Sequence, residues 1–402
     1  MRVLVTSSRN PFALDIVRKL ATTGSTVVAS DTFDGAVGSH SKYLLAHEVT
    51  ASPTFDTDAF TADVVRIVEH YELDTIIPTF EEAFYLSARR ADLPSHVRLY
   101  TGEFTQLAHL HDKNSFQRIA KAADVPVPET IIATDDASLR AATERYPHWF
   151  ARAAFSRGGV ALLTNTGPIA AQSDIADVHP TREQPWLVQP FVSGPMVCTY
   201  STVIDGRVTS HATYRAIEQW ENSTAVGFES IDSTVTFEYV QRIVGQLGNY
   251  SGQLSFDFVD HDGGLLGIEC NPRTTNGVTL MTAEHFATAV STPGSGPFVV
   301  EPGVRTEISA AVLAEAFAQP LRHMPTSVRE LLTVPDLGKG WHDGGAMLWA
   351  PAALVHGLRL GRGQHEKALA ALGEDIVWDG GPIEGTTPEQ QRMLAELHAE
   401  GE

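Results

Sequence analysis

The sequence is poor in cysteine, in positive charge and in long apolar runs, and each shortage excludes a class of protein. Cys198 and Cys270 are the two cysteines in 402 residues, which excludes a disulfide framework and fits buried thiols in a reducing compartment. No apolar run is long enough to span a bilayer, and a strand is expected directly after Met1, without a signal peptide. Only 29 Lys and Arg face 49 Asp and Glu, and the net charge of −20 argues against binding to nucleic-acid backbones or anionic membranes. We therefore expect a cytoplasmic protein, with no nucleic-acid or membrane partner, that acts on small molecules.

The first hundred residues also lack the G-x-G-x-x-G pattern of a dinucleotide site, although strands and helices alternate there. We predict strands at 3–5, 26–29 and 75–78 and helices at 11–22, 58–71 and 81–90. This alternation indicates βαβ units and a parallel sheet. Glu81 and Glu82 follow the last of these strands, at the edge where open α/β sheets bind ligands. They are either substrate contacts or the acidic first turn of a helix.

A hairpin with three polar side chains is the most informative feature that the sequence does contain. Residues 254–270 form two apolar runs around an acidic, glycine-rich turn, which predicts two paired strands. Asp257 lies on the first strand, and Glu269 and Asn271 share one face of the second because they are two residues apart. Across the hairpin the three side chains can converge as oxygen ligands for Mg²⁺. Arg273 follows directly, and its planar fork suits a phosphate. The alternative is a hairpin with ordinary polar residues near its turn.

An acid followed by Glu-x-Asn-Pro-Arg in two apolar strands resembles the metal-binding end of the ATP-grasp superfamily, ligases that make an acyl phosphate from ATP and a carboxylate. Within the superfamily, the carbamoyl-phosphate-synthetase-like group looks most similar, in the segments 78–84, 155–157 and 268–273. The resemblance covers roughly residues 1–290. It implies an α/β protein with the ATP-grasp fold, in which a Rossmann-like N-terminal domain precedes a central nucleotide-binding domain and an α+β C-terminal part. We place these domains at 1–104, 105–290 and 291–402, with a lid subdomain at about 125–190.

The resemblance also assigns residues to the nucleotide. Lys113 would reach the phosphates, and so would Arg152, which stands where a lysine is usual. A small loop between two predicted strands would close over ATP through Ser156, Arg157, Gly158 and Gly159. A hinge strand would bind adenine through Val188, Gln189, Pro190 and Phe191. Met196 replaces the acidic residue that commonly holds the ribose. Taken alone, Lys113 is a solvated surface charge and the loop is an ordinary glycine hairpin.

Two further residues are predicted near the reacting centre. Arg215 ends a hairpin strand and is either a contact to the γ-phosphate or a substrate carboxylate, or an arginine at the rim of a sheet. Asn276 supplies a polar group for substrate binding shortly after Arg273. The segment 216–231 is expected to be polar and mobile and to cap the acceptor site.

The helix that carries Lys113 and the region after residue 290 complete the predicted elements. We predict one helix at 105–123 and, after residue 290, an appendage for packing or partner binding without a catalytic constellation. The elements expected there are a connection at 292–303, helices at 306–318, 365–372 and 388–402, and strands at 346–349 and 375–380.

Together these expectations favour an ATP-dependent carboxylate–amine ligase that uses ATP and Mg²⁺ or Mn²⁺. A carboxylate would be activated as an acyl phosphate and captured by an amine, most simply that of an amino acid, with release of ADP and phosphate. A homodimer is compatible with this function. Three alternatives stay open: a ligase whose acceptor is ammonia, a hydroxyl or a thiol, a nucleotide-binding protein that has lost catalysis, and the carboxylase subunit of a biotin-dependent enzyme.

Overall fold

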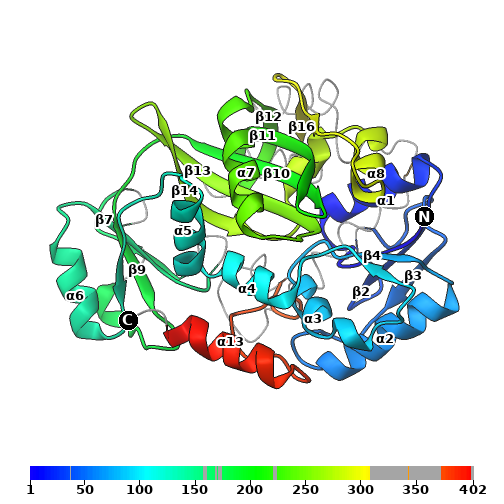
Figure 1. Ribbon diagram of the computed structural model, residues 1–402, viewed down its shortest axis with the longest axis horizontal. Coiled ribbons are helices and arrows are strands. Elements are labelled where there is room, and N and C mark those ends of the chain that lie inside the picture. Colours follow the sequence, from blue (N-terminus) through cyan, green and yellow to red (C-terminus); the bar gives the residue numbers. More distant parts are fainter. Residues whose placement is uncertain are drawn as a thin grey trace, which may run out of the picture.

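Three β-sheets surround a central pair of helices in the described part of the chain (Figure 1). The computed structural model describes residues 1–36, 38–156, 161–167, 170, 174–220, 224–307, 343 and 373–399. The sheets have five, seven and four strands. No helix within these ranges is long and apolar enough to cross a membrane.

The N-terminal sheet is parallel, with the strand order β3-β2-β1-β4-β5. Its strands are β1 (Arg2–Val5), β2 (Thr26–Asp31), β3 (Ala46–Val49), β4 (Thr75–Ile77) and β5 (Arg98–Leu99). Helix α1 (Pro11–Thr22) packs on the face that contains Val3 and Val5. Helices α2 (Thr57–His70) and α3 (Glu82–Ala88) pack on the face that contains Leu4. The predicted βαβ organisation is confirmed, because both faces of a parallel sheet are covered by helices.

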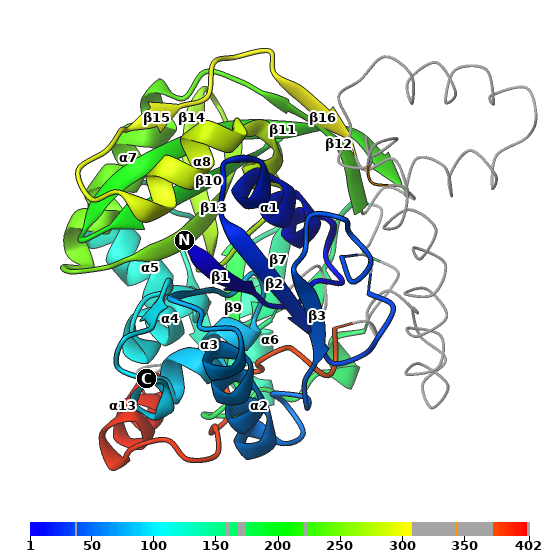
Figure 2. The same ribbon diagram turned by 90° about the vertical axis from the view of Figure 1, so that its right-hand side faces the viewer.

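A large antiparallel sheet lies beside the N-terminal sheet, with the order β14-β13-β10-β11-β12-β16 and with β15 next to β11. Its strands are β10 (Met196–Ile204), β11 (Arg207–Trp220), β12 (Thr224–Ser230), β13 (Gly252–His261), β14 (Gly264–Asn271), β15 (Phe298–Val299) and β16 (Arg305–Glu307). Side chains alternate between its faces, so that Val197 and Val203 pack towards α7 (Thr234–Gln246). Tyr200 and Ile204 share the opposite face with α1 and α8 (Ala283–Ser291), and these two helices lie side by side (Figure 2).

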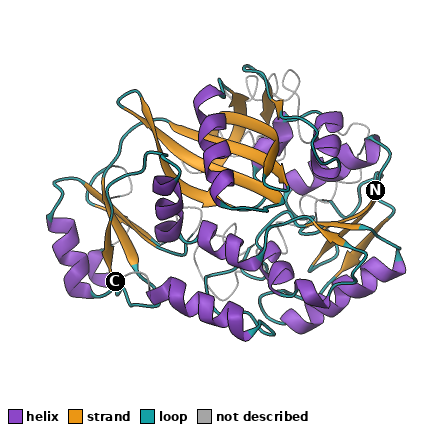
Figure 3. Cartoon of the chain, in the orientation of Figure 1, coloured by secondary structure: helices purple, strands orange, loops and turns teal. Residues whose placement is uncertain are grey.

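A small antiparallel sheet lies at the other end of the molecule (Figure 3). Its order is β6-β9-β7-β8, and the strands are β6 (Ile131–Ala133), β7 (Trp149–Ala153), β8 (Leu162–Thr164) and β9 (Trp186–Pro190). Helix α6 (Asp136–Glu144) covers one face through Leu139 and Ala142, which form a separate small core with Ala151, Leu163 and Val188. This sheet occupies the segment for which a lid was expected.

The central helical pair corrects the prediction of one helix at 105–123. The chain forms α4 (Phe104–His111) and α5 (Lys113–Ala122), with Asp112 between them in an extended conformation. The Asp112 carboxylate accepts a hydrogen bond from the backbone N–H of Ser115 at 2.6 Å, so it caps the second helix. The break makes Lys113 the first residue of α5 and turns its side chain towards the small sheet.

Three further expectations were wrong in the strands of the large sheet. The segment 216–231 is mostly strand, because β11 extends to Trp220 and β12 pairs with both β11 and β16. Thr306 lies in β16, so the helix expected at 306–318 does not begin there, and the connection expected at 292–303 contains β15. The rest of that helix and the elements predicted at 346–349 and 365–372 lie outside the described residues.

The C-terminal segment 373–399 is part of the core, which corrects the expectation of an appendage. Helix α13 (Pro388–Ala399) follows α4 along the lower side of the molecule towards the small sheet (Figure 1). Leu394 and Leu397 belong to the same buried cluster as α3 and α4, and so does Trp378. Residues 375 and 376 lie in a turn and 377–379 have no regular secondary structure, so the strand predicted within 375–380 does not form.

Candidate active site

Two carboxylates lie side by side on the hairpin of β13 and β14. Asp257 and Glu269 are direct partners in the strand register. The amide Nδ2 of Asn271 lies 3.3 Å from Asp257 Oδ2 and 3.3 Å from Glu269 Oε1, so it bridges the two acids. Burial and the negative charge of Glu269 raise the pKa of Asp257 to about 7. The three predicted metal ligands are therefore neighbours, as the hairpin pattern implied.

The donor set of this cluster fits a hard divalent cation. Its side chains offer oxygen, and a cation between the two adjacent carboxylates would offset the repulsion that raises the pKa of Asp257. The Asn271 amide nitrogen faces the acids in this structure, while its oxygen accepts from Arg273 Nη2 at 3.2 Å. Ligation by the Asn271 oxygen requires the amide to turn by 180°, a change that exchanges N and O and breaks the contact with Arg273. The ligand role of Asn271 stays a prediction that depends on this rotation.

Two cations of the predicted phosphate site approach the acids from the side of the small sheet. Arg152, next to the last residue of β7, places Nη1 3.1 Å from Glu269 Oε2 and donates from Nη2 to the carbonyl of Ile268. Its Nε is buried and has no hydrogen-bond partner among the described residues. Burial lowers the pKa of Arg152, and the Glu269 carboxylate opposes that effect. The small sheet and the large sheet thus meet through Arg152 and Glu269.

Lys113 is the second of these cations. Its Nζ donates to the carbonyl of Ser156, at the start of the predicted glycine loop, and the side chain is buried. Burial lowers the pKa of Lys113 to about 8. Burial by itself would raise the pKa of Glu269, but the positive charges of Lys113 and Arg152 hold that pKa below its ordinary value. The two acids of the hairpin therefore differ: nearby positive charges outweigh the effect of burial on Glu269, whereas on Asp257 burial and the charge of Glu269 outweigh the effect of Arg273.

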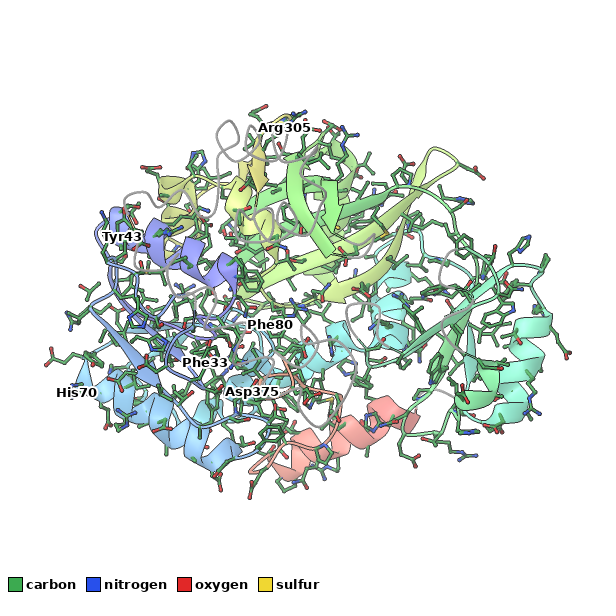
Figure 4. The ribbon with its side chains drawn as sticks, turned by 180° about the vertical axis from the view of Figure 1, so that it is seen from behind. Phe33, Tyr43, His70, Phe80, Arg305 and Asp375 are labelled. Carbon is green, nitrogen blue, oxygen red and sulfur yellow. The ribbon has the colours of Figure 1, made fainter. Side chains whose placement is uncertain are left out.

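Arg273 lies on the side of the cluster that faces the N-terminal sheet. Its guanidinium stacks on the ring of Phe80 at 4.3 Å, and Nε is 3.6 Å from Glu81 Oε1. Phe80 lies near the middle of the molecule, where the N-terminal and large sheets meet (Figure 4). Glu81 is fully buried, and Glu82 accepts from the backbone N–H groups of Thr79 at 2.9 Å and Phe80 at 3.1 Å. Glu82 thus closes the loop after β4, a role different from the predicted substrate contact.

The structure leaves Arg215 outside this group. Tyr214 is in register with Cys198 and hence with Asp257, so the next residue points to the opposite face of the sheet. Arg215 Nη2 donates to Glu229 Oε2 at 2.9 Å, and its side chain is 56% exposed. Glu229 also pairs with Arg305, which lies at the far rim of the large sheet (Figure 4). This is the rim arginine that the sequence left open as the alternative.

Strand β9, where the hinge is predicted, has fewer backbone groups available to hydrogen-bond adenine than we expected. Val188 has strand neighbours on both edges, Ile131 and Ala151, and the N–H of Phe191 donates to the carbonyl of His148 at 2.9 Å. The side chain of Gln189 donates to Thr130 at 2.9 Å, and Pro190 has no N–H. Adenine binding at Val188, Gln189, Pro190 and Phe191 stays a prediction.

Other predicted residues have a location but no tested role. Asn276 begins the short helix η3 (Asn276–Leu280), and its carbonyl accepts from Thr279 Oγ1 at 2.7 Å. Ser156 contributes its carbonyl to Lys113, whereas Arg157, Gly158 and Gly159 lie outside the described residues.

The structure also adds two residues that sequence reasoning missed. Cys198 lies directly opposite Asp257, and burial together with that carboxylate raises the pKa of its thiol. Trp378 donates its backbone N–H to Glu81 Oε2 at 3.0 Å. A strand register indicates neighbours such as Cys198, but no local pattern predicts a contact across 297 residues of chain.

The arrangement of the three sheets is shared with known enzymes, although no family model matches the chain. N5-carboxyaminoimidazole synthetase from Staphylococcus aureus, complexed with ADP, superposes with a TM-score of 0.60 at 13% identity, over 80% of this chain and 86% of that one. Biotin carboxylase from Campylobacter jejuni, in a β-γ-ATP complex, has a TM-score of 0.58 at 15% identity, over 76% and 74%. Phosphoribosylamine–glycine ligase from Thermotoga maritima has a TM-score of 0.56 at 15% identity, over 76% and 78%.

These likenesses establish the fold class. The protein has the ATP-grasp fold, in which a parallel N-terminal sheet precedes two antiparallel sheets along the chain, as the sequence resemblance implied.

Proposed function

We propose that the protein is an ATP-dependent ligase that joins a carboxylate to an amine through an acyl phosphate and releases ADP and phosphate. The observation that carries the proposal is the connection between the two sheets: Arg152 from the small sheet pairs with Glu269, which lies beside Asp257 on the large sheet. Lys113 and Arg273 flank this group from opposite sides. Acidic side chains that can bind a cation and basic side chains that can bind phosphate thus lie in one cluster, as transfer of a phosphoryl group requires.

The role proposed for each residue follows from its position in the site. Bound at Asp257, Glu269 and a rotated Asn271, Mg²⁺ or Mn²⁺ would supply the positive charge that neutralises the β- and γ-phosphate oxygens. Lys113 and Arg152 would hold phosphate from the side of the small sheet. The N–H of Arg152 Nε has no hydrogen-bond partner among the described residues and could donate to phosphate. Arg273 would hold the acid to be activated, because its guanidinium is fixed beside the acids by Phe80 and Asn271.

The reaction balances without a covalent enzyme intermediate. A carboxylate oxygen attacks the γ-phosphorus, and the bond from that phosphorus to ADP breaks. The amine nitrogen then attacks the carbonyl carbon of the acyl phosphate, phosphate leaves, and the amine loses a proton. The buried setting of Lys113 and Arg152 excludes water from one side of the intermediate, which limits its hydrolysis.

Known structures of the same fold support a nucleotide substrate. Two of the similar proteins were solved with ADP or an ATP analogue, and the name of a third gives glycine as a partner in ligation. The charge cluster, by contrast, is observed in this protein itself. We propose the site residues that were predicted from the sequence, except Arg215 and Glu82.

Release of ADP from ATP, measured with a panel of carboxylic acids crossed with amino acids, tests the function. An amide product identified by mass, absent without either substrate and absent with Glu269→Gln, would support the proposal. Products only with ammonia, alcohols or thiols would replace the amine by another acceptor. ADP release that depends on bicarbonate and biotin would indicate a carboxylase. Binding of MgADP without turnover on any pair would indicate a nucleotide-binding protein.

A further inference from the structure

The C-terminal segment reaches the candidate site although it lies beyond the region of sequence resemblance. The indole of Trp378 packs on Phe84 and Phe104, with ring centroids 4.6 and 5.5 Å away. It also contacts the ring of Phe155, the residue before Ser156, at a centroid distance of 5.6 Å. Asp375, three residues earlier, pairs with Arg9 at 2.6 Å and lies below Phe80 and near Phe33 in Figure 4. The segment is thus anchored on the N-terminal domain, the central helices and the base of the lid.

The backbone of this segment holds one particular carboxylate. The N–H of Trp378 donates to Glu81 Oε2 at 3.0 Å, and the other oxygen, Oε1, is 3.6 Å from Arg273 Nε. The exposed fraction of Glu81 is 0%, so a substrate cannot contact it in this structure. The negative charge of Glu81 is therefore directed at Arg273 and not at a ligand.

The other contacts of Arg273 use one face of the guanidinium, Nη1 and Nη2, which leaves Nε for Glu81; Nη1 donates to the carbonyl of Thr274 at 3.2 Å. Phe80 supports one face of the guanidinium at 4.3 Å, and the ring permits rotation about the stacking axis. Nη2 donates to Asn271 Oδ1 at 3.2 Å, a contact that would be lost if the amide turned towards a cation. A buried carboxylate at Nε would keep the planar fork in the same orientation after that change.

We propose that Glu81 is a positioning residue that orients Arg273 towards the acid substrate, and that the C-terminal segment holds Glu81 in place through the N–H of Trp378. This inference rests on the proposed ligase function. It gives residues 373–399 a part in the reaction, and it moves Glu81 from the substrate contacts to the residues that act through another side chain.

A double-mutant cycle tests the inference with Glu81→Gln, Arg273→Met and the double variant. Gln has the shape of Glu and still accepts from the Trp378 N–H, so the fold should persist, as circular dichroism can check. Glu81→Gln should lower kcat with the best substrate pair roughly 10- to 100-fold, because a small misplacement of a substrate-holding group has that effect. The affinity for MgADP, measured by calorimetry, should not change. Added to Arg273→Met, the same substitution should lower kcat no further.

Glu229→Gln is the matched control, because Glu229 also pairs with arginine but at the outer rim, and its kcat should equal that of the wild type. Glu81→Asp keeps the charge and should recover part of the kcat lost in Glu81→Gln. Full activity of Glu81→Gln, an equal loss of MgADP affinity, or an undiminished effect in the Arg273→Met background would overturn the inference. A wild-type protein that releases no ADP with any pair would overturn the proposed function, and that result appears before any variant is compared.

Discussion

Replacing Asp257 by Asn should stabilise the ligand-free protein and at the same time remove its response to MgADP. The unfolded chain loses the Asp257 proton near pH 3.8, whereas the folded protein holds it up to about pH 7. Stability contributed by this proton is present at low pH and is lost as the pH rises through about 7. The difference between these two pKa values corresponds to roughly 4 kcal/mol at pH 8. Because the carboxylate is partly exposed to solvent, we expect about 2 kcal/mol.

The measurement is chemical unfolding of both proteins in a chelator at pH 8, followed by thermal unfolding with and without MgADP. Asp257→Asn should unfold at a higher denaturant concentration than the wild type, and the difference should shrink as the pH falls from 8 towards 4. MgADP should raise the unfolding temperature of the wild type but not that of the variant, since ligands stabilise only the states they bind. The two effects have opposite signs, which separates loss of a ligand site from general damage.

Glu269→Gln provides the contrast for this prediction. Glu269 is compensated by Lys113 and Arg152, so its removal should not stabilise the chelated protein. Asp260→Asn, at an exposed position of the same strand, should change neither stability nor the response to MgADP. A variant Asp257→Asn that is less stable than the wild type in chelator at pH 8 would refute the account of Asp257 as a carboxylate that folding destabilises in its charged form.

Three further predictions concern the other charges of the site. Glu269→Gln should abolish turnover with an unchanged circular dichroism spectrum, because it removes one negative charge from the cation site without changing volume; full activity would remove the proposed metal site. Arg273→Ala should reduce trapping of the acyl phosphate by hydroxylamine more than it reduces ATP binding, and equal losses would indicate a general phosphate clamp. Burial lowers the pKa of Lys113 to about 8, so the affinity for MgADP should fall as the pH rises above 8 and binding there should take up a proton, seen by calorimetry in two buffers. Lys113→Met should bind more weakly with no such pH dependence, and a wild type without proton uptake would contradict this role.

The parts of the fold that follow local patterns could be predicted from the sequence. Apolar runs that alternate with helical spacing are sufficient for the parallel N-terminal sheet, and the two-residue spacing of Glu269 and Asn271 is sufficient for their shared face. The break at Asp112 was missed because the apolar pattern continues across it, while a side-chain cap decides the boundary. The strands in 216–231 were missed because pairing with β16 overrides a polar composition.

The candidate site shows the same limit at the level of single residues. Arg215 adjoins Tyr214, which shares a face with Asp257, and alternation along a strand already places Arg215 on the other face. That signal was present, but it required the register of three strands. Glu81 and Glu82 are adjacent acids at a helix start, and no local rule tells which one turns to the site. Trp378 could not be found because its contact with Glu81 is purely tertiary.

The charges of the site suggest how Arg152 would move in the proposed reaction. The described cluster contains three acids and three bases: Glu81, Asp257, Glu269, Lys113, Arg152 and Arg273. Without ligands, Arg152 serves as the counter-charge of Glu269, so a bound cation would take over that role and release the guanidinium towards phosphate. An arginine suits this exchange better than a lysine, because its fork holds the Ile268 carbonyl and Glu269 together and presents a further N–H on a different edge. Binding of cation and nucleotide should then be mutually favourable, since each removes a charge that opposes the other.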